Sequence, residues 1–229
     1  MPEPTEWGQK AFARDMGRFL SKQKQRIMAR IKSETPLELI WPIEFWEGEK
    51  RLLKVPLAKN LQRIAEHSAG LLLGKRPVVE EIIITEQILS WVARHSDEIA
   101  GTINTYTRRV VENAFTDFFM VSGYTRRDFE DAISSVVSPA RAEGIAVTEV
   151  TRAHYEGSET VANEVRSAGF DLVGYWNTNA DGLVCPICLP LHRLPETPEG
   201  GWDPSGTGPG AYPPAHPRCR CWITYGRRK

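Results

Sequence analysis

All four cysteines of this 229-residue chain lie in two short clusters near its C-terminal end. The first cluster, DGLVCPIC, contains Cys185 and Cys188, and the second, HPRCRC, contains Cys219 and Cys221. A Cys-x-x-Cys turn can direct two sulfurs at one tetrahedral ion, and Cys-x-Cys on a strand places both side chains on the same face. His216 precedes Cys219 by one turn and is a fifth candidate donor. The spacing therefore predicts one metal site, with four cysteines or with three cysteines and His216.

Zinc is the ion that this donor set favours, because soft thiolates and a closed tetrahedral geometry suit it. Its apparent binding free energy in small sites, about 10–16 kcal/mol, is large enough to hold a proline-rich loop closed. Pro186 and Pro217 stiffen the clusters and so reduce the entropy lost on closing them. We therefore expect a structural Zn²⁺ ion as the cofactor.

Two disulfides, unconnected thiols and a catalytic zinc are the alternatives to a structural zinc. Disulfides are disfavoured in a reducing compartment. A catalytic zinc needs an open coordination position, whereas here five protein donors compete for four places. No pair of carboxylates and no Ser/His/Asp set has a spacing that indicates catalysis, and we expect no enzymatic activity.

The segment between the two clusters, residues 189–218, is rich in proline and glycine, and we expect a loop without a core of its own, ordered from its ends. His192 lies in this loop and is expected to be exposed rather than a ligand. The flanking segments 170–178 and 219–225 are rich in β-branched and aromatic residues, which predicts two short strands.

The chain before residue 170 has apolar residues at helical spacing, which predicts long helices. The predicted fold class is α+β, mainly α: long helices are followed by a small C-terminal β-hairpin and zinc-knuckle module with a Pro/Gly-rich loop. The first expected helix spans 7–32, and the second is kinked or restarted near Pro56 and ended by Gly74. A third spans 79–122 with a break at Gly101. A short helix from Thr125 to Val137 follows, and the last helix begins at Ser138 and Pro139.

Four segments follow from this organisation. They are a basic amphipathic N-terminal helix (1–33), a helical segment with the aromatic anchors Trp41, Phe45 and Trp46 (34–78), a helical body (79–169) and a Cys/His zinc-type module with a basic tail (170–229). Small residues on the last helix, such as Ala146 and Gly157, predict that another helix packs closely against it.

The N-terminal helix carries eight lysines and arginines between residues 10 and 32 but only one acid, Asp15. Such a run is usually a solvated face, and a contact with DNA or an acidic partner is the alternative. The candidate contact residues are Lys10, Arg14, Arg18, Lys22, Arg26 and Arg30. The whole chain has 29 basic and 29 acidic residues, so any field that attracts nucleic acid must be local.

No apolar run approaches the roughly 20 residues that cross a bilayer, and the N-terminus lacks the apolar core of a signal peptide. We therefore expect no membrane partner and synthesis in the cytoplasm.

Four stretches in order resemble the Mu F-like minor head proteins of tailed bacteriophages, also called phage head morphogenesis proteins. They are GYTRRDFEDAISSV, AEGIAVTEVTRA, YWNTNADGLVCPICLPLH and PPAHPRCRCWI, and the match covers about residues 80 to 225. Its most specific parts are the Ile-Ala-x-Thr-Glu helix, the approach Trp-x-Thr-x-x-x-Asp and the closing His-Pro-x-Cys-Arg-Cys, with residues Ile145, Ala146, Thr148, Glu149, Trp176, Thr178, Asp181, His216, Pro217, Cys219, Arg220 and Cys221.

The resemblance implies a structural protein of the virion, present in few copies in the head near the portal. Its implied roles are head (procapsid) assembly and the packaging or delivery of DNA, within the host cytoplasm during assembly. The implied partners are the portal protein and the major capsid or scaffold proteins. The basic N-terminal helix lies outside the matched region, and its charge makes packaged double-stranded DNA a further candidate partner. Thr178 and Asp181 precede the first cluster and are expected to orient its ligands.

Two further hypotheses come from other functional classes. A zinc-ribbon protein that binds nucleic acid without a virion role would use the basic helix and bind DNA in a salt-sensitive way. A zinc-dependent hydrolase or nuclease would lose activity on replacement of His192, His216 or Asp181 while it keeps its fold and metal.

Overall fold

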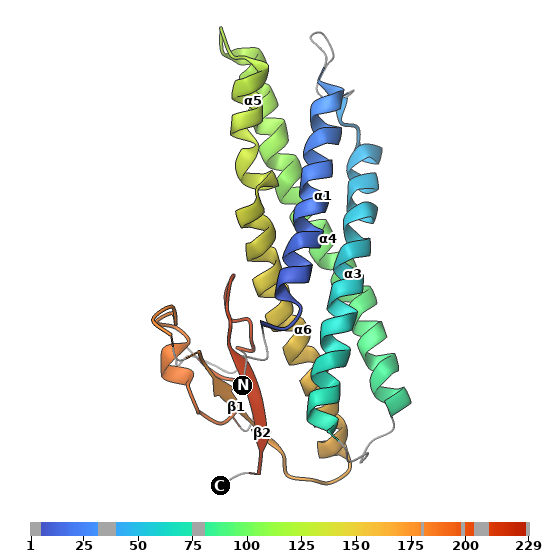
Figure 1. Ribbon diagram of the computed structural model, residues 1–229, viewed down its shortest axis with the longest axis vertical. Coiled ribbons are helices and arrows are strands. Elements are labelled where there is room, and N and C mark those ends of the chain that lie inside the picture. The colour runs from blue at the N-terminus through green and yellow to red at the C-terminus, as the bar shows by residue number, and fades with distance from the viewer. Residues whose placement is uncertain are drawn as a thin grey trace.

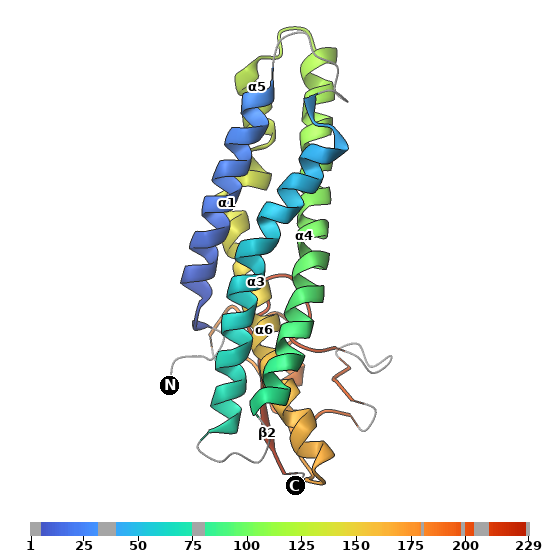
Figure 2. The same ribbon diagram turned by 90° about the vertical axis from the view of Figure 1, so that its right-hand side faces the viewer.

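The computed structural model describes residues 6–31, 40–74, 81–179, 181–197, 200–203 and 211–227. Four long helices, named α1, α3, α4 and α6, run side by side along the long axis of the molecule (Figures 1 and 2). Their bounds are Gln9–Arg30, Ile43–Leu73, Glu81–Met120 and Pro139–Ser167. The short helix α5 (Arg126–Ala132) and the 3₁₀ helix η2 (Ser134–Val137) connect α4 to α6.

A small C-terminal module lies beside the lower half of α6 (Figure 1). It contains β1 (Val173–Asn177), the 3₁₀ helix η3 (Leu189–Leu191) and β2 (Trp222–Gly226). The two strands form one antiparallel sheet, with Trp176 opposite Ile223. The fold is therefore α+β and mainly α, as predicted.

Three clusters of buried apolar residues hold these parts together. The first fills the interior of the bundle and joins side chains of α1, α3, α4 and α6. The second lies at the bundle end that contains α5 and includes Trp41 and Trp46, which are 3% and 1% exposed. The third lies in the C-terminal module and also includes Tyr155 of α6. The aromatic anchors Trp41 and Trp46 are thus core residues.

Two predicted helix starts are confirmed. The Thr125 hydroxyl accepts a hydrogen bond from the Asp128 N–H, and the Asp128 carboxylate accepts one from the Thr125 N–H, which is a capping box. The Ser138 hydroxyl accepts the Arg141 N–H at 3.1 Å, with Pro139 in the first turn. The start predicted at Val79 lies outside the described residues.

The breaks predicted at Gly101 and near Pro56 are partly wrong. Helix α4 runs through Gly101 without interruption, and α3 continues through Pro56 without restarting. A helical glycine costs only about 1 kcal/mol, which packing along a 40-residue helix readily outweighs. The proline leaves the Leu52 carbonyl without its helical donor, and Leu52 is 51% exposed, so water can reach that part of the helix.

Two expectations for the C-terminal module also need correction. Cys219 and Cys221 do not lie on a strand, because β2 begins at Trp222. The Pro/Gly-rich loop does contribute to a core: Leu191 and Trp202 are 3% and 2% exposed and belong to the third cluster. The Trp202 indole N–H donates to the Leu194 carbonyl at 2.9 Å, which ties one part of the loop to another.

Helices α3 and α6 cross at Gly157, as the run of small residues predicted. A Cβ atom at this position would lie 2.0 Å from the Ala65 carbonyl oxygen. Since that neighbour is backbone, the two helices must move apart to admit any side chain. Among the described helices, none is both long enough and apolar enough to cross a membrane.

We expect Gly157→Ala to lower the free energy of unfolding by about 1–3 kcal/mol or more, because overpacking forces a backbone shift. Gly70→Ala is the matched control. Gly70 is in α3 with nothing within 4 Å of its added Cβ, so we expect a gain of up to about 1 kcal/mol. Urea denaturation measures both, and equal stability of the two variants would contradict this crossing geometry.

Candidate metal centre

The first cysteine cluster is a tight turn that aims its sulfurs inward. The Cys188 N–H lies 3.2 Å from the Cys185 carbonyl oxygen and 3.3 Å from the Cys185 sulfur. Helix η3 begins directly after Cys188 and continues the turn. A backbone N–H directed at a sulfur stabilises the thiolate, which is the form that binds a metal.

The second cluster is held against α6 by two threonines. The Arg218 N–H donates to the Thr148 hydroxyl at 2.9 Å, and the Thr151 hydroxyl donates to the Cys219 carbonyl at 2.6 Å. Arg218 has a φ of 62°, a left-handed conformation that is uncommon for a side-chain-bearing residue. These hydrogen bonds fix the turn that presents Cys219.

The five predicted donors lie together. His216 Nε2 is 2.9 Å from the Cys185 sulfur and 3.3 Å from the Cys188 sulfur, and the Cys188 and Cys219 sulfurs are 3.9 Å apart. Two groups of donors, each within 4.8 Å, share Cys188: one adds Cys185 and His216, and the other adds Cys219 and Cys221. Sulfurs bound to one tetrahedral zinc lie about 3.8 Å apart, given Zn–S bonds of about 2.3 Å. The cluster can therefore hold a metal ion, and the four cysteines form no disulfide.

A small cavity of about 30 Å³ lies among these donors and is lined by all five of them. That volume has room for about one ion or one water molecule. Asn179 also lines it and is only 4% exposed, yet neither its Nδ2 nor its Oδ1 has a hydrogen-bond partner in the described part of the chain. A buried amide without a partner is costly, so this side chain fits a site where a charged group joins the donors.

The sulfurs share protons in a way that favours metal binding. The Cys188 thiol beside it lowers the pKa of Cys219, and the same hydrogen bond raises the pKa of Cys188. This hydrogen bond favours the thiolate form of Cys219. Because acid protonates thiolates and imidazole, a metal held here is released as the pH falls.

His216 has the orientation of a metal ligand. Its Nδ1 lies 2.8 Å from the Pro217 carbonyl oxygen and can donate to it, which leaves Nε2 facing the Cys185 and Cys188 sulfurs. Metal-bound histidines usually donate their second N–H to a carbonyl in this way. Burial alone lowers the pKa of His216, but the Pro217 carbonyl and the Cys219 and Cys185 sulfurs raise it above its ordinary value.

Asp181 and Thr178, which were expected to orient the ligands, instead bond to residues of the neighbouring loops. Asp181 accepts two hydrogen bonds from Arg220, at 2.7 and 2.8 Å, and this pair lowers the pKa of Asp181. The pair connects the residue between Cys219 and Cys221 to the approach to the first cluster. Thr178 contacts His192 Nδ1 at 3.1 Å through its N–H. His192 is exposed, as expected, and is in neither donor group.

The basic face of α1 divides into two parts. Arg26 forms a two-pronged ion pair with Glu49, at 2.5 and 2.7 Å, and Glu49 is only 2% exposed. Arg30 donates to the Ile40 carbonyl at 3.0 Å and lies over the Phe45 ring. These two candidates are thus engaged within the fold. The exposed basic stripe consists of Lys10, Arg14, Arg18 and Lys22.

Thr151 and Asn179 are parts of the centre that the sequence did not reveal. Thr151 follows the quoted Thr148 by one helical turn, and this spacing alone could have indicated a second contact on the same face. Asn179 lies between Thr178 and Asp181, but nothing in the sequence distinguishes it from a loop asparagine.

Comparison with known proteins adds no relative. The chain matches no family model, no curated protein and no solved structure.

Thr151→Val should remove the hydrogen bond between α6 and the second cysteine cluster, while the side chain keeps nearly the same volume. The variant leaves the buried Cys219 carbonyl without a donor, so we expect a loss of about 1–3 kcal/mol in the free energy of unfolding. Thr160→Val is the control, because within the described residues the Thr160 hydroxyl bonds only to the Glu156 carbonyl of its own helix. It should change stability by about 0.5 kcal/mol or less. Equal losses in urea denaturation would show that the contact to Cys219 contributes nothing.

Proposed function

We propose that this chain is a minor structural protein of a tailed-phage head. In this proposal it acts near the portal in procapsid assembly and in the packaging or delivery of DNA, as a non-catalytic component. One observation carries the proposal: the stretches that resemble the Mu F-like proteins meet in space. Thr148 of the helix stretch binds the backbone of Arg218, and Asp181 of the middle stretch binds Arg220. Distant motifs that form one contact network support a common origin for the whole region.

We further propose that the donor cluster binds one structural Zn²⁺ ion through Cys185, Cys188, Cys219 and His216. The contact of His216 Nδ1 with the Pro217 carbonyl favours His216 as the fourth ligand, and Cys221 then remains a buried thiol beside the site. Four protein ligands leave no open position for a reacting water molecule, which supports a structural rather than a catalytic ion. Asn179 would donate its amide N–H to a metal-bound thiolate.

Such a chain suits an assembly role on mechanical grounds. The helix bundle has buried apolar clusters in its interior and at its α5 end, and the C-terminal module projects to one side of it (Figure 1). Zinc would fix the loop of that module, so that it presents a constant surface to a neighbouring subunit. A rigid surface loses little conformational entropy on binding.

Location in the virion tests the function. Heads purified from cells that carry the phage should contain the chain in few copies by mass spectrometry, with density at the portal vertex in cryo-electron microscopy. Heads assembled with the Cys188→Ser chain should retain much less of it, because the module loses its metal. The matched control is Thr160→Ser, which should be retained as the natural chain is.

Absence from purified heads would contradict the proposal. The DNA-binding alternative would then be supported if the isolated chain binds double-stranded DNA and this binding weakens steeply as the salt concentration rises. Neutralising Lys10, Arg14 and Lys22 should lower the salt slope by about 3 in that case, since each phosphate contact contributes about 0.9. Neutralising Arg51, Lys59 and Arg94, which are exposed on other helices, is the control for total charge.

A further inference from the structure

A surface groove of about 700 Å³ lies between α6 and the C-terminal module, away from the cysteine cluster. Its walls include Tyr155 and Glu159 of α6, Asp171 before β1, and Glu196 and Tyr212 of the loop. Gly200 and Gly201 shape the loop wall with φ angles of 89° and 74°. A Cβ on Gly201 would lie 3.1 Å from Tyr212 Cζ, so glycine is what lets the loop hold this ring in place.

The groove has an excess of negative charge. Three acids line it, Glu159, Asp171 and Glu196, against one base, Arg166, which leaves a net charge of −2. Arg166 is fully used, with Nη1 2.6 Å from Glu159 and Nη2 2.7 Å from Glu196. No described base pairs with Asp171, and the second oxygen of Glu196 has no partner in the described part of the chain.

Tyr155 gives independent evidence for a ligand. Its side chain is 8% exposed and lines the groove, yet its hydroxyl makes no hydrogen bond to any described residue. A phenol hydroxyl both donates and accepts hydrogen bonds, so this one is available to a ligand in the groove. The ring lies 5.2 Å from the Tyr212 ring, so two aromatic side chains line the groove together with the three acids.

We propose that this groove binds an arginine side chain from a segment of a partner protein. A guanidinium group is planar, stacks on aromatic rings and donates to carboxylate and phenol oxygens at once. A lysine ammonium is more strongly hydrated and does not stack in this way. The groove is open to the surface along its length, which suits one face of a peptide segment better than an enclosed small molecule. The inference does not depend on a role in the virion.

The test titrates the full-length, metal-loaded chain with three blocked pentapeptides by calorimetry at low salt. They are Gly-Arg-Gly-Arg-Gly and its lysine and citrulline counterparts. We expect the arginine peptide to bind, the lysine peptide to bind more weakly by about three-fold or more, and the citrulline peptide not to bind. The interaction should weaken as salt rises.

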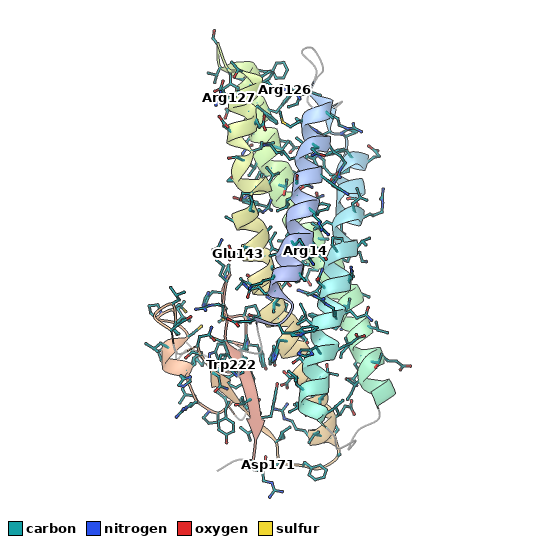
Figure 3. All side chains as sticks on the ribbon, in the orientation of Figure 1. Arg14, Arg126, Arg127, Glu143, Asp171 and Trp222 are labelled. Atoms are coloured by element: carbon teal, nitrogen blue, oxygen red, sulfur yellow. The ribbon has the colours of Figure 1, made fainter. Side chains whose placement is uncertain are left out.

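Variants separate the groove from general charge attraction. Tyr155→Phe removes only the unpaired hydroxyl, so it should lower affinity about ten-fold and leave thermal stability unchanged or raised. Asp171→Asn should lower affinity about three- to five-fold. Glu143→Gln is the control, because Glu143 lies in the upper part of α6, far above Asp171 in Figure 3. Lack of binding, equal binding of the lysine peptide, or an equal loss in the Glu143 variant would each overturn the proposal.

Discussion

The crowding of donor atoms in the C-terminal module is the constraint on which its structure depends. His216 Nε2 lies 2.9 and 3.3 Å from the Cys185 and Cys188 sulfurs, and the Cys188 and Cys219 sulfurs are 3.9 Å apart. Several thiolates at such distances repel one another strongly in a partly buried place. Hydrogen bonds among Cys188, Cys219 and Cys221 relieve part of this repulsion, and a divalent cation would relieve it further. A cation between the two clusters would therefore add to the hydrogen bonds, the Asp181–Arg220 pair and the buried apolar contacts that already hold this module together.

Helix α6 connects the cysteine cluster to the rest of the protein, because one of its faces packs against α3 and another contacts the C-terminal module. One face carries small and apolar residues and lets α3 approach to backbone contact at Gly157. The other carries Thr148, Thr151, Tyr155 and Glu159 at helical spacing, and these side chains contact the C-terminal module in turn. Glu159, the last of them, accepts a hydrogen bond from the Tyr225 hydroxyl at 2.6 Å. The orientation of the metal centre and the shape of the acidic groove are thus set by one helix.

The sequence predicted those features that depend on local spacing. Helical periodicity, the caps at Thr125 and Ser138, and the Cys-x-x-Cys turn each involve residues a few positions apart. It could not predict features that depend on distant partners. In the sequence Arg26 resembles a solvated cation, but in the fold it pairs with Glu49 from another helix. Trp202 lies in a loop whose composition gives no sign of a core, yet its side chain is buried. Gly101 resembled a break because local propensity says nothing of the packing that carries α4 through it. The donor set was predictable from spacing, but the contact between His216 Nδ1 and the Pro217 carbonyl required coordinates.

The most direct test of the account is the metal content of the full-length chain purified under reducing conditions, followed by X-ray absorption spectroscopy. The account predicts one zinc ion per chain with three sulfur neighbours at about 2.3 Å and one nitrogen neighbour at about 2.0 Å. His216→Ala should remove the nitrogen neighbour. A chain that is fully folded without bound metal, or a metal surrounded mainly by oxygen, would contradict the claim that these donors close the C-terminal module around an ion.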